Sequence, residues 1–167
     1  MKNYEIIDNA LSPEHFHVLK DYMTNHCDWY FQENITADPE EKVFPFSYFY
    51  HTFFEYNNDY TIHVSRDYQI LLPILNILKP KALSRVKGNL YVNQNQFVNH
   101  GKHYDSPHDL FIAVYYVNSN NGYTALEDGT KIESVENRLV IFKSDVLHNS
   151  TNCTDEWTRI TINFNYF

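Results

Sequence analysis

From Leu83 to its last residue, the chain alternates short apolar runs with turn signals, and this pattern limits the fold more than any other feature. Aromatic and β-branched residues, which suit a half-buried pleated surface, fill the runs, and the chain holds 14 Tyr and 12 Phe beside 4 Gly. Asn121-Gly122 and Asp128-Gly129 are typical of turns between strands. The pattern favours a β-sandwich or barrel. The predicted strands are Arg85–Val92, Leu110–Val117, Thr124–Glu127, Lys131–Ser134, Leu139–Phe142 and Arg159–Phe167.

The first half of the chain predicts helices that flank this β-structure. One helix should begin after Ser12, which can cap it, with Pro13 at the first helical position. A second should span Arg66–Leu78 and end before Pro80, and Pro73 within it indicates a kink or a late start. Helices outside a mostly-β sandwich or barrel are therefore expected. The remaining predictions are strands at Tyr4–Asp8 and Trp29–Phe31, a loop at Thr36–Lys42, and a strand or binding surface at Phe44–Phe54.

The charge of the chain argues against a nucleic-acid partner. Its formal value is −8 at pH 7, whereas neutralisation of phosphates by basic residues dominates nucleic-acid affinity. The only basic cluster is Lys79, Lys81, Arg85 and Lys87, which we interpret as a solvated face around the end of the second helix.

Cysteine usage and hydropathy predict a soluble, cytoplasmic protein with no membrane partner. Two cysteines do not make a disulfide framework, and the N-terminal segment does not resemble a signal peptide. The longest apolar stretch, Ile70–Leu78, is too short to span a bilayer. With 167 residues and no repeat or linker, the chain is expected to form one domain over residues 1–167. The sequence leaves the oligomeric state open.

A His-x-Asp motif lies just before the strand Leu110–Val117. The side chains of His103 and Asp105 point to the same side of an extended backbone, so they can converge on one metal ion. His148, later in the chain, can supply a third ligand. Two histidines and one carboxylate on one face of an octahedron leave three positions open, which is typical of non-haem Fe(II) oxygenases.

The same short motif also occurs at His26-Cys27-Asp28. That match lies near the end of the first predicted helix, and no run of strands follows it. A bare His-x-Asp motif is weak without structural context, so we set this second match aside.

Arg159 opens the last predicted strand, in the run Arg-Ile-Thr-Ile-Asn-Phe. A guanidinium in such an apolar strand is costly to bury unless it meets an anion. Its planar fork matches a carboxylate with two hydrogen bonds. Arg159 is therefore a candidate for binding the distal carboxylate of a dicarboxylic acid. The alternative is a strand-edge arginine in a surface ion pair.

Taken as a set, these motifs resemble the prolyl-4-hydroxylase branch of the 2-oxoglutarate/Fe(II)-dependent dioxygenases. The resemblance covers residues 83–167 and implies a catalytic core with the double-stranded β-helix fold, which is jelly-roll and cupin-like. Residues 1–82 would supply a helical flank and substrate loops. The motifs that carry it are His103-Tyr-Asp-Ser-Pro, Ile112-Ala-Val-Tyr-Tyr-Val-Asn, Asn121-Gly-Tyr-Thr, Asn137-Arg-Leu-Val-Ile-Phe, His148 and Arg159-Ile-Thr-Ile-Asn-Phe.

The resemblance also implies roles for individual residues. His103, Asp105 and His148 would bind Fe(II), and Arg159 would bind the 5-carboxylate of 2-oxoglutarate. Tyr91 resembles the family tyrosine that contacts this carboxylate, although the loop from Tyr91 to His103 can shift its register. Ascorbate is a further cofactor to consider. The other residues that the resemblance places in the co-substrate pocket are Tyr116, Asn89 and Asn163.

The substrate is less constrained than the metal site. The resemblance favours hydroxylation of a prolyl residue in a peptide or protein, with release of succinate and CO₂, and the aromatic tract Phe44–Phe54 could line a groove for such a chain. A free amino acid or another small molecule is the alternative. Nucleobase demethylation is disfavoured, because relatives with that activity carry a second arginine where this chain has Asn165. From another class, a non-catalytic jelly-roll protein with a structural metal remains open.

Overall fold

The structure is a computed structural model and describes residues 3–33, 47–57, 59–106 and 108–167. The predicted loop at Thr36–Lys42 and the first residues of the aromatic tract, 44–46, lie outside these ranges.

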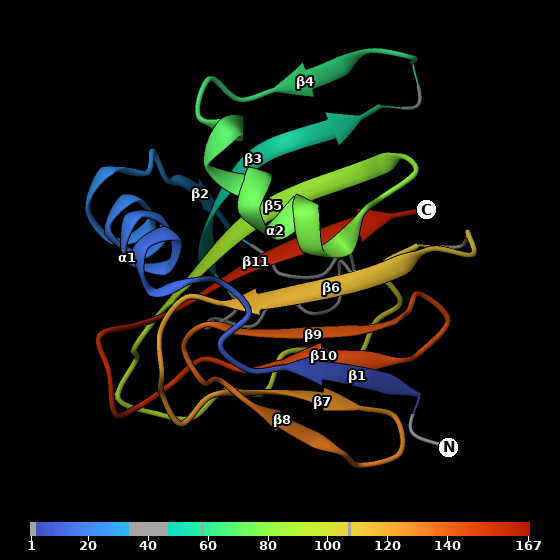
Figure 1. Cartoon of the computed structure of the whole chain (residues 1–167). Coiled ribbons are helices and arrows are strands. Elements are labelled where there is room, and N and C mark those ends of the chain that lie inside the picture. The colour runs from blue at the N-terminus through green and yellow to red at the C-terminus, as the bar shows by residue number, and fades with distance from the viewer. Residues whose placement is uncertain (1–2, 34–46, 58, 107) are drawn as a thin grey trace.

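The largest feature of the described chain is one eight-stranded antiparallel sheet (Figure 1). Its strands follow the order β1-β9-β6-β11-β5-β3-β2, and β4 also pairs with β3. They are β1 (Tyr4–Ile7), β2 (Tyr30–Gln32), β3 (Tyr48–Tyr56), β4 (Ile62–Val64), β5 (Leu83–Val92), β6 (Phe111–Tyr116), β9 (Arg138–Lys143) and β11 (Thr158–Tyr166). A second, three-stranded sheet has the order β10-β7-β8 and consists of β7 (Tyr123–Leu126), β8 (Lys131–Glu133) and β10 (His148–Ser150).

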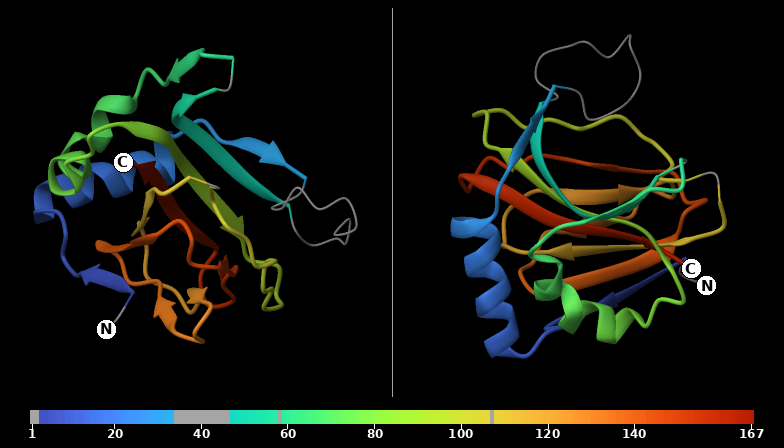
Figure 2. Two further views of the ribbon diagram at one scale, coloured as in Figure 1. Left: turned by 90° about the vertical axis from the view of Figure 1, so that its right-hand side faces the viewer. Right: turned by 90° about the horizontal axis from the view of Figure 1, so that it is seen from above.

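The helical segments lie against one face of the large sheet (Figure 2). They are α1 (Pro13–Asp21), the π-helical turn Tyr22–His26, the 3₁₀ turn Tyr68–Leu71 and α2 (Leu72–Leu78). Phe16 and Leu19 of α1 pack with Ile160, Ile162 and Phe164 of β11. These alternate residues of β11 point to one face, and their burial against the helices forms the larger apolar core.

The opposite face of the large sheet divides into an apolar and a polar part. Toward β9 and β6, Val140 and Ile112 pack with Leu126 and Ile132 of the small sheet in a second core. Toward β11 and β5, the residues on this face are polar and line a cavity. The fold thereby places a hydrophilic pocket between two layers that apolar contacts hold together.

The helix ends follow the chemistry expected from the sequence. The Ser12 hydroxyl accepts a hydrogen bond from the His15 amide at 3.4 Å, and Pro13 begins α1. The second helix begins late: a 3₁₀ turn precedes α2, which starts at Leu72 with Pro73 in its first turn. It ends before Pro80 at Lys79, whose φ is 48°. The predicted helices and their caps are confirmed.

Every predicted strand of the second half is present with its ends shifted by two residues at most. Two short strands, β4 and β10, were not expected. Gly129 has φ 85° in the turn between β7 and β8, as Asp128-Gly129 indicated. The described helices include none that is long and apolar enough to cross a membrane. That residues 1–167 form a single domain stays a prediction.

Candidate metal centre and its cavity

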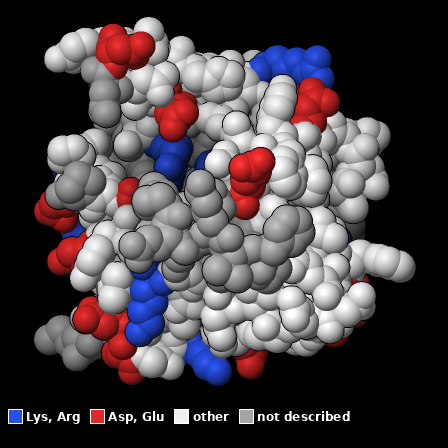
Figure 3. Space-filling model, turned by 180° about the vertical axis from the view of Figure 1, so that it is seen from behind, with Lys and Arg blue, Asp and Glu red and all other residues white. Residues whose placement is uncertain are grey.

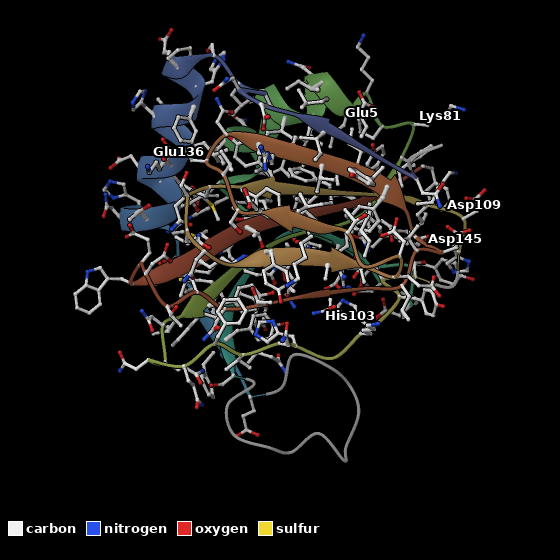
Figure 4. All side chains as sticks on the ribbon, turned by 90° about the horizontal axis from the view of Figure 1, so that it is seen from below. Glu5, Lys81, His103, Asp109, Glu136 and Asp145 are labelled. Atoms are coloured by element: carbon white, nitrogen blue, oxygen red, sulfur yellow. The ribbon has the colours of Figure 1, made fainter. Side chains whose placement is uncertain are left out.

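His103, Asp105 and His148 lie together, with one potential ligand atom of each within 4.8 Å of the others. Asp105 Oδ1 is 3.8 Å from His103 Nε2, and Asp105 Oδ2 is 3.6 Å from His148 Nε2. One ion can bridge this spacing with small side-chain movements. Figure 4 shows His103 on the side of the large sheet that faces away from α1 and α2.

The backbone pairing holds the two histidines side by side, and the orientation of each ring leaves its Nε2 available to a metal. His103 and His148 form an antiparallel β-bridge, in which each amide bonds the carbonyl of the other at 2.9 and 3.2 Å. His103 Nδ1 lies 3.1 Å from the Gly101 carbonyl, and His148 Nδ1 lies 3.0 Å from the Val146 carbonyl. A carbonyl oxygen only accepts, so each Nδ1 carries the proton and each Nε2 keeps a lone pair for a metal.

Asp105 has a buried carboxylate, and one of its oxygens lacks a hydrogen-bond partner among the described residues. Its side chain is 6% exposed, and within the described ranges Oδ2 has no hydrogen-bond partner. Burial would raise the pKa of Asp105, but the neighbouring His148, Arg85 and His103 hold it below its ordinary value. Burial would likewise lower the pKa of His148, but the Asp105 carboxylate raises it. A buried carboxylate whose two oxygens each lie beside a histidine Nε2, one of them without a hydrogen-bond partner, fits a divalent cation.

The second His-x-Asp match does not form such a site. His26 Nε2 is paired with Asp21 at 3.2 Å, and the Asp28 carboxylate is paired with Arg66 at 2.9 Å. Both histidine and carboxylate at this position are exposed.

The three candidate ligands open into a cavity of about 380 Å³. Alternate residues of β5 and β11 line it, because the intervening residues point into the apolar core. A structural metal site is usually closed by four protein ligands, whereas this one faces open space. The lining residues from these two strands are Arg85, Lys87, Asn89, Tyr91, Arg159, Thr161 and Asn163.

Arg159 is the largest fully buried side chain that lines this cavity, at 1% exposure. Nε donates to Ser134 Oγ at 2.7 Å, Nη1 to the Thr151 carbonyl at 3.2 Å and Nη2 to Thr124 Oγ1 at 3.3 Å. All these acceptors are neutral, and no carboxylate lies within 4.0 Å of the guanidinium in the described ranges. Burial accordingly lowers the pKa of Arg159. The surface ion pair that the sequence left open is therefore excluded for the described residues.

Tyr91 is the register partner of Arg159 across β5 and β11. Its ring centroid lies 5.6 Å from the guanidinium carbon, and it lines the cavity, so the loop before His103 has not moved it away. Tyr116 lies equally close to the guanidinium, at 5.6 Å, but its hydroxyl donates to Thr124 Oγ1 and it does not line the cavity. Asn89 and Asn163 both line the cavity.

Gly122 leaves room for the buried arginine. A Cβ added at Gly122 would stand 2.5 Å from Arg159 Cδ and 2.6 Å from the Asn152 carbonyl oxygen. Gly122 does not have a positive φ. Close approach of the Arg159 side chain and the Asn152 backbone, rather than turn geometry, therefore requires glycine here.

The interpretation of the basic cluster as a solvated face was wrong for two of its four residues. Lys79 and Lys81 are exposed, and Figure 4 shows Lys81 pointing away from the ribbon. Arg85 and Lys87, by contrast, line the cavity. The residues alternate with Val86 and Gly88 on β5, and that period of two is the signal that could have placed them with Asn89 and Tyr91.

Of the two histidines that flank the metal motif, one lies near the cavity. His100 is buried, its ring is 4.8 Å from that of Tyr91, and Nδ1 lies 2.8 Å from Ser150 Oγ. Burial, with the charges of Arg159 and His103, lowers the pKa of His100 to about 3. His108 is exposed and does not line the cavity.

Solved structures share this fold across almost the whole chain. A 2OG-Fe(II) oxygenase family oxidoreductase from Burkholderia pseudomallei has a TM-score of 0.71 at 9% identity, over 98% of this chain and 84% of its own. A prolyl hydroxylase from Trichoplax adhaerens, in complex with a peptide of the hypoxia inducible factor oxygen degradation domain, has a TM-score of 0.71 at 14% identity, over 99% and 83%. The chain has the fold of the 2OG-Fe(II) oxygenases. The predicted double-stranded β-helix is thus confirmed.

The same fold also serves other chemistry. Two structures of the non-heme alpha ketoglutarate dependent epimerase SnoN of nogalamycin biosynthesis each have a TM-score of 0.66 over 99% of this chain. One is 11% identical and covered to 77% of its own length, and the other is 10% identical and covered to 78%. No model of a protein family matches the sequence, and no curated protein matches it. The neighbours therefore establish the fold, and the function has to be argued from the site.

Proposed function

We propose that this protein is an Fe(II)- and 2-oxoglutarate-dependent oxygenase that hydroxylates a C–H bond of its substrate. The observation that carries the proposal is the pairing of a three-ligand metal site with a buried guanidinium on one cavity. Arg159 has only neutral partners among the described residues, and a buried charge of this kind is costly without an anion. A dicarboxylic acid that also binds the metal supplies that anion.

Each residue has a defined part in this arrangement. His103, Asp105 and His148 would hold the metal, and Arg159 would bind the 5-carboxylate of 2-oxoglutarate through its remaining N–H groups. When bound, Fe(II) and 2-oxoglutarate supply the oxidising chemistry, with succinate and CO₂ as co-products. Tyr116 would act as a positioning residue, since it packs on Arg159 and does not line the cavity.

The polar groups beside Arg159 would complete the co-substrate pocket. Tyr91 lies opposite Arg159 in the sheet, and its hydroxyl is 3.5 Å from Ser150 Oγ. Asn89 and Asn163 lie on the same cavity wall and offer amide groups to the co-substrate. Asp105 keeps a carboxylate at the position that halogenating relatives leave vacant for halide, which favours hydroxylation.

A peptidyl proline is the proposed substrate, and a free amino acid or another small molecule is the alternative. Support for the peptide comes from the fold shared with a peptide-bound prolyl hydroxylase. Tyr48 of β3 lines the cavity, and further tyrosines follow it across β3 and β2: ring to ring, Tyr48 lies 6.4 Å from Tyr50, and Tyr50 lies 6.0 Å from Tyr30. Aromatic walls of this kind suit extended Pro-rich chains.

A non-catalytic metal protein is the competing class. Such a protein does not need a buried arginine on the same cavity as an incompletely coordinated metal. The deciding experiment incubates the protein with Fe(II), O₂ and 2-oxoglutarate, with and without ascorbate, and measures succinate. The proposal expects metal-dependent succinate, and mass spectrometry of Pro-containing peptides and free amino acids should then find a product one oxygen atom heavier. Absence of succinate with correctly folded, iron-bound protein would reject the proposal.

A further inference from the structure

Two cationic side chains line the cavity beyond the one that 2-oxoglutarate needs. Arg85 and Lys87 lie on the same face of β5 as Asn89 and Tyr91, nearer the start of the strand. They share the cavity with the candidate metal ligands and with Arg159. The space-filling view in Figure 3 shows one group of basic atoms recessed in a hollow on this side of the molecule, while other basic side chains stand on its surface.

The charges of Arg85 and Lys87 are not balanced by the metal site or by the co-substrate. A divalent ion and the Arg159 guanidinium are together offset by the Asp105 carboxylate and the dianion of 2-oxoglutarate. Arg85 and Lys87 then have no anionic counterpart inside the cavity. The Arg85 side chain is 33% exposed and Lys87 is partly buried, and partial loss of water makes a third anion favourable there.

The ammonium of Lys87 contacts only neutral groups among those described, and these contacts fix its position. Nζ donates to the Tyr48 hydroxyl at 2.6 Å and lies 5.0 and 4.6 Å from the ring centroids of Tyr48 and Tyr50. No carboxylate lies within 4.0 Å of Nζ in the ranges that the structure covers. Burial, with the charge of Arg85, lowers the pKa of Lys87 to about 8, against the opposing charges of Glu55 and Asp105. At neutral pH the ammonium is therefore still charged, and its charge is not compensated by a close contact.

Arg85 also has unused hydrogen-bonding capacity. Its Nη2 lies 3.5 Å from Asp105 Oδ1, a contact too long to saturate a guanidinium. Among the described residues, its Nε is buried without a hydrogen-bond partner. Native proteins seldom leave such a donor unpaired, so the Arg85 guanidinium has N–H groups available for an acceptor of a ligand.

We propose that the prime substrate carries a carboxylate, which Lys87 and Arg85 bind while its reacting carbon faces the metal. The inference rests on the proposed function, since it assigns the Arg159 end of the cavity to 2-oxoglutarate. A compact ammonium and a planar fork side by side match a carboxylate well. The carboxylate belongs either to a small free acid or to an acidic side chain of a peptide.

The test uses acids and their uncharged isosteres on anaerobic protein that carries Fe(II) and saturating 2-oxoglutarate. Benzoate against benzamide probes a free acid, and a blocked Ala-Pro-Glu-Ala peptide against its Gln counterpart probes an acidic side chain. Dissociation constants are measured by tyrosine and tryptophan fluorescence. At least one acid should bind about tenfold more tightly than its isostere, and the pair that discriminates more strongly identifies the source.

Substitutions at Lys87 and at a control lysine test whether Lys87 causes the preference for the acid. Lys87→Met should abolish the preference for the acid, and Lys87→Arg should retain most of it. Lys131→Met is the matched control, because Lys131 also lies over a tyrosine ring, 4.6 Å from that of Tyr123, but outside the cavity. Equal binding of acid and amide by the parent protein would overturn the inference, as would an acid preference that Lys87→Met leaves intact. Failure of the proposed function looks different: no succinate forms, whatever the probes do.

Discussion

His103 and His148 face each other across a single antiparallel β-bridge, with backbone hydrogen bonds of 2.9 and 3.2 Å in both directions. Their ring centroids are 4.7 Å apart. The bridge joins a loop that precedes β6 to the short strand β10, so two histidines distant in the sequence lie side by side. Because the backbone itself fixes this pair, substitution of either side chain should remove a ligand without separating the two segments.

Gly122 tests whether the position of Arg159 matters. Gly122→Ala places a methyl group against Arg159 Cδ and the Asn152 carbonyl, so the guanidinium has to shift. We expect the KM for 2-oxoglutarate in succinate formation to rise about tenfold or more. Gly129→Ala is the control: it strains a φ of 85° with nothing within 4 Å of the new Cβ. It should lower stability by about 1 kcal/mol and leave the KM unchanged. Equal KM changes in both variants would contradict this role of Gly122.

Arg159→Ala should raise the KM for 2-oxoglutarate about tenfold to hundredfold, because hydrogen bonds to a charged group contribute about 1.5–3 kcal/mol. Affinity for Fe(II) alone should change much less, since Arg159 is not a metal ligand. Steady-state succinate assays and anaerobic iron titrations measure the two effects. Arg66→Ala, at an exposed arginine, is the control. An unchanged dependence on 2-oxoglutarate would remove Arg159 from the pocket.

His100 should make the metal-free protein sensitive to acid. Its folded pKa of about 3 lies below the ordinary value of 6.5, so the unfolded chain takes up a proton first as pH falls. Stability is therefore full above about pH 6.5 and is lost as pH falls toward 3, by up to ~1.4 kcal/mol per unit. Urea unfolding from pH 7 to 5 measures the slope. His100→Phe should flatten it, and the exposed His15→Phe should not; equal slopes in all three proteins would refute this assignment.

The sequence predicted the elements of the fold well, because their signals are local. Ser12 and Pro13 specify the start of α1, and Pro73 and Pro80 bound α2. β10 escaped prediction because His148–Ser150 is short and polar, and because long-range pairing holds it, with β7 and with the loop before β6. Short strands of this kind have no periodicity to detect.

Within the site, the sequence identified residues whose chemistry is unusual for their surroundings. It missed residues that belong to the site only because of the strand face on which they lie. Arg159 stood out as a charge in an apolar strand, and it is buried there, while its role in binding a dicarboxylic acid stays a prediction. Arg85 and Lys87 were grouped with Lys79 and Lys81 by sequence proximity, although only the first two alternate onto the cavity face of β5. Tyr115 and Tyr116 point to opposite faces of β6. The resemblance named Tyr116, and the packed structure shows that Tyr116 meets Arg159 from outside the cavity lining.

The central claim is that His103, Asp105 and His148 bind one iron on which succinate formation depends. Anaerobic titration with Fe(II), followed by an oxygen-dependent succinate assay, tests it in the parent protein, in Asp105→Ala and in His148→Ala, with Asp109→Asn at an exposed ion pair as the control. We expect one iron per chain and metal-dependent succinate in the parent and control, and at least a ~100-fold loss of succinate in the other two variants. Undiminished iron binding and turnover in Asp105→Ala and His148→Ala would contradict the account.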